Sequence, residues 1–321
     1  MKNKIKIICT LGPTSLNKEF LVFSRKKIDL LRLNMSHLSV ANLKKSIKFV
    51  RKYTRTPICI DTEGAQIRIK VRKERSFKIG QHIKINNLNG KTNLYPQTIY
   101  EKIKIGDILN VGFKNLRLKV IKKKKYILCK VLSSGKLENN KGVHIENRNI
   151  KLSYLTKKDL EAIKIGKRLK IKHYALSFTN TTDDIIKFNK LLKKENKIFK
   201  IETLKAVKSF KLILKKGNNF LIDRGDLSKD VKVENIPLVQ RKLFKLKRKF
   251  KNKNIFVATN LLETMLKDNY PTRGEANDIF STIEMGANGL VLAAETAIGM
   301  HPKDTVIFLQ KMIKVFKKNK H

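Results

Sequence analysis

Two carboxylates and a lysine stand where polar residues follow apolar, strand-like segments. Glu202 and Asp226 follow neighbouring segments of this kind, and such a pair suits Mg²⁺ or Mn²⁺, which prefer oxygen ligands. Lys200 lies two residues before Glu202, so both side chains are expected on the same face of one strand. A cation beside a metal site fits the stabilisation of a phosphoryl group during transfer. This spacing therefore predicts metal-dependent phosphoryl chemistry.

Arg32 and Gly225 are candidates for holding an anionic ligand. Arginine is suited to phosphate because it donates two parallel hydrogen bonds. Glycine permits close approach of the backbone, so its N–H can meet a ligand carboxylate. Each motif also has a structural interpretation when taken alone. Lys200-Ile201-Glu202 suits a surface strand, and Arg224-Gly225-Asp226 usually forms a turn.

Other polar residues near the same segments have equally ordinary interpretations. A lone histidine such as His37 is more often structural than functional. Asn34, Ser36 and Thr62 could cap the helices that follow their strands. The functional interpretation gains weight because charged and hydroxyl-bearing residues follow all of the strand-like segments. In a barrel, the C-terminal ends of the strands meet at one face, and active sites form there.

The elements that would position these residues alternate regularly between strand-like and helical patterns. Eight short apolar runs rich in β-formers are predicted strands: Ile5–Cys9, Asp29–Asn34, Pro57–Asp61, Tyr174–Phe178, Lys197–Glu202, Asn219–Asp223, Asn254–Thr259 and Gly289–Ala293. Amphipathic segments between them are predicted helices, for example Val40–Tyr53, Thr182–Lys194, Leu204–Leu214 and Glu275–Met285. Eight strand–helix units predict a parallel, closed α/β structure, a (β/α)₈ TIM barrel.

One connection, between the third and fourth predicted strands, is far longer than the others. Its middle alternates apolar strands with Gly and Asn turns, and the predicted strands are Ser76–Ile79, His82–Ile85, Asp107–Val111, Leu116–Val120 and Tyr126–Val131. We therefore expect a small all-β domain at residues 69–150, inserted into a barrel formed by residues 1–68 and 151–321. Because loops at this barrel face build sites, the insert is a candidate lid.

The net charge of +47 invites a nucleic-acid interpretation. However, the positive charge is spread along the whole chain, and its densest runs, Lys122–Lys125 and Lys245–Lys253, lack the interleaved aromatic residues that stack on bases. We therefore expect only nonspecific nucleic-acid binding, as a side effect of the charge.

No apolar run reaches the roughly 18 residues that a membrane helix needs. The N-terminal segment Met1–Leu11 is too short and too interrupted by lysine to be a secretory signal. We therefore expect a cytoplasmic protein without a membrane partner. The sequence has three cysteines, Cys9, Cys59 and Cys129, which are far apart and form no CxxC pair, so we expect neither disulfides nor a zinc site. Cys9 and Cys59 are predicted to be buried thiols.

The polar strand ends occur in an ordered series of motifs that resembles the pyruvate kinase family along essentially the whole chain. The motifs are Cys9-Thr10-Leu11-Gly12-Pro13, Arg32-Leu33-Asn34-Met35-Ser36-His37, Asp61-Thr62-Glu63-Gly64-Ala65-Gln66-Ile67-Arg68, Lys141-Gly142-Val143, Lys200-Ile201-Glu202, Arg224-Gly225-Asp226-Leu227, Ala258-Thr259-Asn260-Leu261-Leu262-Glu263 and Pro271-Thr272-Arg273-Gly274-Glu275.

The resemblance implies phosphoryl transfer from phosphoenolpyruvate to ADP, giving pyruvate and ATP in glycolysis. Glu202 and Asp226 would hold Mg²⁺ or Mn²⁺, and the catalytic residues would be Lys200 and Arg32, which stabilise the phosphoryl group, and Thr259, near which the enolate is protonated. The implied substrate-binding residues are Arg32, Lys200, Arg224, Gly225, Asp226 and Thr259.

The resemblance also implies a nucleotide site and a monovalent-cation site. The implied nucleotide-binding residues are Pro13, Asn34, His37 and Arg68. The implied K⁺ ligands are Asn34, Ser36, Asp61 and Thr62. The inserted domain would be the lid that excludes water when it closes.

Several positions depart from the family pattern. Asp223 stands before Arg224, where the family has a small residue, and adds a negative charge near a site for an anionic acid. Val111-Gly112-Phe113 replaces an acidic lid motif. Glu63 and Gln66 replace a lysine and a charged residue, so the K⁺ requirement stays open.

The family's long C-terminal domain has no counterpart in this sequence. We therefore expect a monomer or a homodimer, and no activation by fructose 1,6-bisphosphate. Two other functions remain open. One is a specialised relative that acts on a different enol phosphate or 2-oxo acid, and the altered lid and Asp223 favour it. The other is a non-catalytic protein that binds nucleic acid or a metabolite, against which Lys200, Glu202, Asp226 and Thr259 argue.

Overall fold

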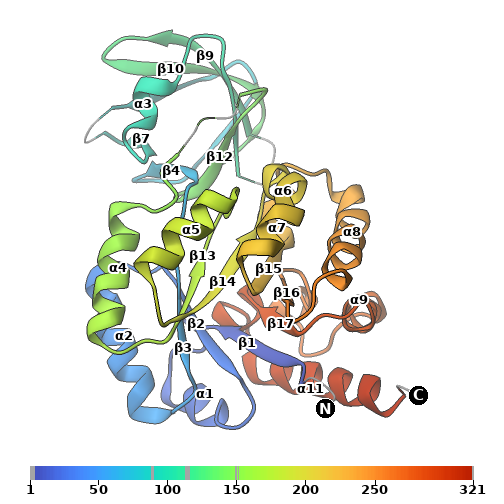
Figure 1. Ribbon diagram of the computed structural model, residues 1–321. Coiled ribbons are helices and arrows are strands. Elements are labelled where there is room, and N and C mark those ends of the chain that lie inside the picture. Colours follow the sequence, from blue (N-terminus) through green and yellow to red (C-terminus); the bar gives the residue numbers. More distant parts are fainter. Residues whose placement is uncertain (1–3, 88–89, 113–115, 149, 151, 320–321) are drawn as a thin grey trace. The chain divides into compact units, whose positions relative to one another are not determined.

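The computed structural model describes residues 4–87, 90–112, 116–148, 150 and 152–319 (Figure 1). The chain divides into two compact units, Met1–Gly64 with Lys157–His321, and Ala65–Thr156. Phe113, part of the altered lid motif, and Lys151, an expected domain boundary, lie outside the described residues.

The first unit is a closed barrel of parallel strands, as the alternating pattern predicts. Its strands are β1 (Lys6–Thr10), β2 (Leu30–Asn34), β3 (Ile58–Asp61), β13 (His173–Leu176), β14 (Asn196–Ile201), β15 (Asn219–Asp223), β16 (Asn254–Ala258) and β17 (Gly289–Leu292). They pair in sequence order around the barrel, and β17 closes it against β1. The carboxyl ends of all eight strands therefore meet at one face.

Apolar side chains from every strand fill the barrel. One buried cluster draws on all eight strands: Ile8, Leu30, Cys59, Ala175, Ile198, Leu221, Phe256, Ala258 and Val291. Such layers of branched side chains make the barrel interior a packed core. The three cysteines are buried and free, which confirms the expected buried thiols at Cys9 and Cys59.

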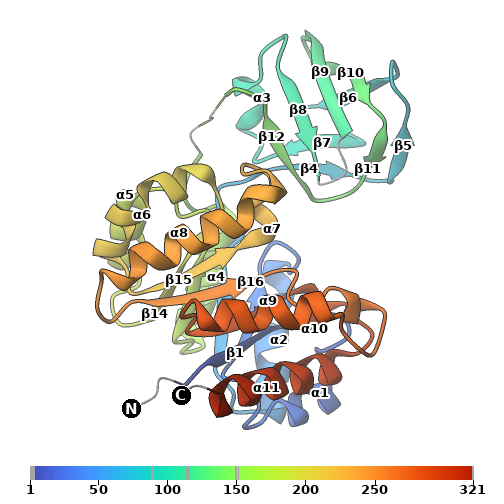
Figure 2. The ribbon, with the colours of Figure 1, turned by 90° about the vertical axis from the view of Figure 1, so that its right-hand side faces the viewer.

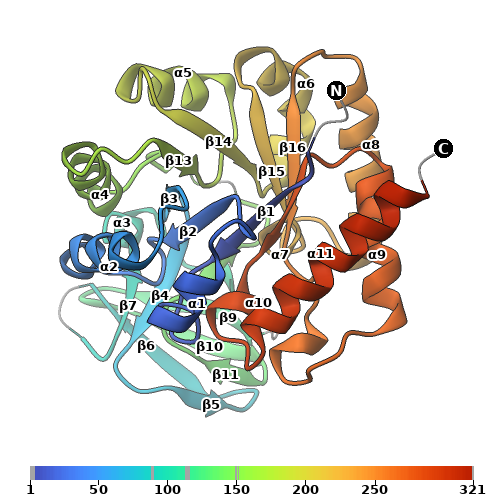
Figure 3. The ribbon, with the colours of Figure 1, turned by 90° about the horizontal axis from the view of Figure 1, so that it is seen from below.

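Helices surround the strands, as Figure 3 shows from below. The longer ones are α1 (Lys18–Phe23), α2 (Val40–Tyr53), α4 (Lys157–Arg168), α5 (Thr182–Leu191), α6 (Leu204–Lys216), α8 (Ile236–Arg248), α9 (Arg273–Glu284) and α11 (Pro302–Lys318). Short turns of helix are α7 (Arg224–Leu227), α10 (Ala294–Ala297), η1 (Val233–Asn235) and η2 (Thr264–Leu266). No helix among the described residues is long and apolar enough to cross a membrane.

Two of these helices begin at reciprocal capping boxes. Thr181 accepts a hydrogen bond from the backbone of Asp184, whose side chain bonds back to the Thr181 backbone, and Thr272 and Glu275 do the same at α9. These reciprocal bonds satisfy backbone N–H groups that have no partner inside the helix. Because the cap at Thr272 precedes the apolar pattern, α9 begins two residues before the predicted start.

The second unit is an all-β domain with its own core (Figure 2). Its elements are β4 (Ile67–Val71), β5 (Arg75–Phe77), β6 (His82–Asn86), β7 (Thr92–Tyr95), α3 (Ile99–Lys102), β8 (Ile108–Val111), β9 (Leu116–Lys123), β10 (Tyr126–Ser133), β11 (Gly135–Leu137) and β12 (Lys141–Ile145). Seven of these strands form a closed sheet. The entering strand β4 and the leaving strand β12 pair antiparallel inside it.

Candidate active site

Lys200 lies near the end of β14, where three carboxylates surround its ammonium group. Nζ is 2.8 Å from Oε1 of Glu202, 3.3 Å from Oδ2 of Asp61 and 3.4 Å from Oδ2 of Asp223. Burial alone would lower the pKa of Lys200, but the charges of Asp61 and Glu202 raise it well above its usual value. The lysine therefore remains a fixed positive charge at neutral pH, with its side chain almost fully buried.

Arg32, at the end of β2, is anchored to the same carboxylate. Its Nε donates to Oδ2 of Asp61 over 2.7 Å, its Nη2 lies 2.6 Å from that oxygen, and its Nη1 donates to the Thr10 hydroxyl over 3.0 Å. Burial would lower the pKa of Arg32, but Asp61 and Asp223 raise it. Asp61 thus orients both cations of the site from β3.

Three carboxylates form a cluster that could hold a metal ion. Oxygen atoms of Glu202, Asp223 and Asp226 lie within 4.8 Å of one another. Burial raises the pKa of Glu202 even though Lys200 opposes this effect. Burial acts in the same direction on Asp223, but Lys200 and Arg32 outweigh it and lower the pKa of that carboxyl. All-oxygen carboxylate donors match the preference of Mg²⁺ and Mn²⁺, so the residues present fit the expected metal.

The backbone at two strand ends adopts left-handed conformations that non-glycine residues seldom occupy. Phe178 has φ of 52° and Thr259 has φ of 77°. The Phe178 N–H donates to Oε2 of Glu202 over 2.5 Å, and the Thr259 hydroxyl donates to Oδ1 of Asp223 over 2.6 Å. For a β-branched residue such as Thr259, positive φ is strained, and strain of this kind gathers at functional sites. Both residues fix a carboxylate of the cluster.

Arg224 and Gly225 follow β15 and pack against the Thr259 segment. The Arg224 guanidinium donates to the carboxylate of Asp278 over 2.9 and 2.7 Å and to the Thr259 carbonyl over 3.0 and 2.7 Å. A Cβ atom at Gly225 would lie 2.7 Å from Cγ2 of Thr259. The glycine is therefore required for close packing against Thr259.

Replacing Gly225 by alanine is expected to displace Thr259 and to lower kcat/KM about 10²-fold, because small misplacements at a reacting centre have effects of this size. Gly274→Ala is the matched control, since its Cβ would meet nothing closer than Oγ1 of Thr272 at 3.8 Å. Steady-state kinetics and a thermal melt of both variants make the comparison. Equal activity in the two variants would show that the position of Thr259 is unimportant.

The residues expected at the K⁺ site lie at the ends of the neighbouring strands β2 and β3, where Asn34 pairs with Asp61. The Asn34 side chain accepts from the backbone of Ser36, and the Thr62 hydroxyl accepts from the backbone of Ser177 over 2.9 Å. The Ser177 hydroxyl lies 3.3 Å from Asp61 Oδ1 and donates to the Thr62 carbonyl over 2.7 Å. Several oxygen atoms are thus grouped beside Asp61.

The residues expected at the nucleotide are distributed over both units. Pro13 and His37 are exposed on the β1–α1 and β2–α2 connections. Arg68 lies in β4 of the second unit, where its guanidinium donates to the Asn140 carbonyl over 3.1 Å. Glu63, which stands in place of the family's lysine, pairs instead with Lys158 over 3.0 Å.

Two interactions of this site were not predicted from the sequence. Asp223 was interpreted as an added charge, whereas it lies in the carboxylate cluster. No partner was predicted for Arg224, which pairs with Asp278 from α9. The position of Asp223 at the end of a predicted strand was the available signal for its place in the cluster. The ion pair between Arg224 and Asp278 joins residues of different elements, so the local sequence gives no signal for it.

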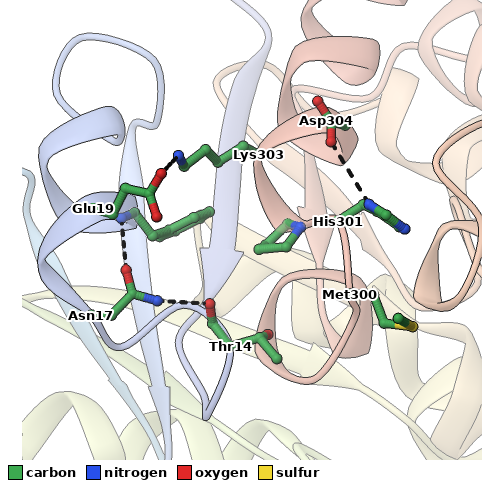
Figure 4. A pocket seen from close by; sticks show the side chains of 9 residues that line it. Thr14, Asn17, Glu19, Met300, His301, Lys303 and Asp304 are labelled. Atoms are coloured by element: carbon green, nitrogen blue, oxygen red, sulfur yellow. Dashed lines mark hydrogen bonds and ion pairs between the residues drawn. The ribbon is translucent and has the colours of Figure 1, made fainter.

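A separate pocket of about 280 Å³ opens between the β1–α1 connection and the start of α11 (Figure 4). Its lining includes Thr14, Asn17 and His301, and an ion pair between Glu19 and Lys303 lies at its edge. The Asn17 side chain donates to the Thr14 carbonyl over 2.9 Å. The lining shares no residue with the carboxylate cluster.

Comparisons with known proteins point to one family. A family model described as "Pyruvate kinase, barrel domain" matches residues 2–306. Pyruvate kinase of Thermotoga maritima is 30% identical over 96% of this chain and 70% of the relative. Pyruvate kinase of Methanocaldococcus jannaschii is 30% identical over 98% of the chain and 70% of the relative. Pyruvate kinase of Staphylococcus aureus is 28% identical over 94% of this chain and 55% of the relative.

Proposed function

This chain belongs to the pyruvate kinase family, and from that premise we propose that it transfers the phosphoryl group of phosphoenolpyruvate to ADP, giving pyruvate and ATP. The observation that carries the proposal is the contact of 2.8 Å between Lys200 and Glu202 beside the carboxylates of Asp223 and Asp226. A permanent cation next to a candidate divalent-metal site is the arrangement that phosphoryl transfer needs.

Glu202 and Asp226, with Asp223 beside them, would hold Mg²⁺ or Mn²⁺. When bound, the metal supplies positive charge that orients and neutralises the anionic substrate. The group of oxygen atoms around Asn34, Ser36, Asp61 and Thr62 is the proposed place of K⁺. ADP is proposed to bind through Pro13, Asn34, His37 and Arg68, and the second unit is the proposed lid. In this proposal the chain acts in cytoplasmic glycolysis.

The side chains of the barrel have distinct roles in the proposed reaction. Lys200 and Arg32 hold fixed positive charge for the phosphoryl group in transfer, and both are prevented from turning away by Asp61. Arg224 maintains the backbone at Thr259 through two hydrogen bonds to its carbonyl. The Thr259 hydroxyl, which donates a hydrogen bond to Asp223, is the proposed relay for the proton that the enolate receives.

The proposal is tested by pyruvate release from purified protein supplied with phosphoenolpyruvate, ADP and Mg²⁺. Pyruvate production that stops in excess chelator and returns with added Mg²⁺ or Mn²⁺ is the expected result. Repeating the assay with and without K⁺ measures the monovalent-cation requirement. Normal turnover in excess chelator, or no pyruvate under any of these conditions, would contradict the proposal.

A second candidate is favoured by Asp223, whose carboxylate lies within the cluster where a carboxylate substrate would approach. A relative acting on a different enol phosphate or 2-oxo acid would tolerate this charge if its substrate carried a neutral group there. A panel of enol phosphates in the same metal-containing assay separates the two functions. Preference for a neutral-ended compound over phosphoenolpyruvate would support the second one.

A further inference from the structure

Asp223 is held in a single orientation by groups on two neighbouring strands. Its Oδ1 accepts a hydrogen bond of 2.6 Å from the Thr259 hydroxyl, and its Oδ2 lies 3.4 Å from Nζ of Lys200. The residue is only 6% exposed. A side chain fixed in this way loses little conformational freedom when it binds a ligand.

An oxygen of Glu202 in the same cluster has no hydrogen-bond partner. Oε2 accepts from the Phe178 N–H, but Oε1 is buried and unsatisfied. Nζ of Lys200 lies 2.8 Å from Oε1 in an ion pair. A carboxylate oxygen in one such contact keeps lone-pair capacity for a further partner, so this buried atom indicates a ligand that completes the site.

The charges around the cluster indicate that this ligand is a cation. Four carboxylates, those of Asp61, Glu202, Asp223 and Asp226, face the ammonium and guanidinium groups of the site. The positive partners are Lys200, Arg32 and, at Asp226, Lys229. Among the described contacts the cluster is predominantly acidic, and buried negative charge favours a cationic ligand.

We propose that Asp223 is a third carboxylate ligand for the divalent cation, and that its charge adds to the affinity of the substrate-free chain for that cation. The inference rests on the proposed metal-dependent function and deepens it. Affinity for hard cations rises with the number of charged oxygen ligands. Thr259 acts on the metal as a positioning residue, because its hydroxyl fixes the orientation of Asp223.

Titration of the substrate-free full chain with Mn²⁺ tests the proposal, with the free ion measured by electron paramagnetic resonance. Asp223→Asn keeps the size of the side chain and removes its charge. We expect its Mn²⁺ dissociation constant to rise at least about tenfold, as for loss of groups that support metal ligands. Asp183→Asn is the matched control, since Asp183 is exposed and forms an ion pair with Lys187 one helical turn away.

A thermal melt without metal shows whether each variant is folded. If Asp223→Asn proves unfolded, Asp223→Ala gives the same measurement with a smaller side chain. Equal Mn²⁺ affinity in wild type and in the folded Asp223 variant would overturn the proposal and leave a two-carboxylate site. Failure of the wild-type chain to bind Mn²⁺ without substrate would overturn it too.

The experiments can reject the third ligand and the proposed function independently of each other. Metal-dependent pyruvate release together with an Asp223 variant of unchanged Mn²⁺ affinity would retain the function and reject the third ligand. Weakened Mn²⁺ binding in the Asp223 variant, together with no pyruvate release by wild type, would retain the ligand and reject the function.

Discussion

Replacing Lys200 by methionine is expected to lower kcat by about 10²–10³-fold, the effect of losing one preorganised electrostatic donor, with a much smaller change in KM. The ammonium group is fixed by Asp61, Glu202 and Asp223. Its charge is needed most when charge spreads over the phosphoryl group in the transition state. Steady-state kinetics of the variant with phosphoenolpyruvate and ADP provides the measurement.

Lys187→Met serves as the control for loss of a positive charge, because Lys187 is an exposed residue of α5 in an ion pair with Asp183. A circular dichroism spectrum of both variants establishes that they are folded. If Lys200→Met raised only KM and left kcat unchanged, Lys200 would bind the ground state and the catalytic assignment would be wrong.

The second large effect concerns stability. Asp61→Asn is expected to lower the free energy of unfolding by about 3–5 kcal/mol, the range for breaking a buried ion pair by removing one partner. Asp61 is completely buried and contacts Arg32 over 2.6 Å and Lys200 over 3.3 Å. Its loss leaves Arg32 without the carboxylate that neutralises it. Urea denaturation monitored by fluorescence or circular dichroism measures the change.

Asp183→Asn is again the control, because the ion pair of Asp183 with Lys187 is exposed and exposed ion pairs contribute little to the free energy of unfolding. If the urea midpoint of Asp61→Asn coincided with that of the wild type, water or the other carboxylates would be compensating the positive charge of Arg32. Asp61 would then be important for orienting ligands and not for holding the barrel together.

The barrel could be predicted from sequence because each of its strands is a short apolar run followed by an amphipathic helix. The second unit was harder, since β4, β7 and β12 are half-polar strands whose pairing joins residues distant in the chain. In α5, the predicted helix continued to Lys194, but the structure ends it at Leu191. Lysines and asparagines near helix ends give little signal for where the last turn stops.

The candidate site was predictable where it depends on position along one strand. Lys200 and Glu202 share a face because side chains alternate along a strand. The bond between Thr259 and Asp223 and the pairing of Arg224 with Asp278 depend on how strands and helices meet in space. The left-handed backbone at Phe178 and Thr259 is likewise imposed by surrounding structure, since neither residue type favours it.

Closure of the barrel by its first and last strands sets an order of events during synthesis on the ribosome. β1 emerges first, but one of its two neighbours is β17, with Cys9 opposite Leu292. The second unit follows only three of the eight barrel strands and has its own core, so it can fold while the barrel is still incomplete. One edge of β1 stays unpaired until β17 has been made. In that interval the nascent chain exposes a strand edge that is prone to aggregation and suited to protection by chaperones.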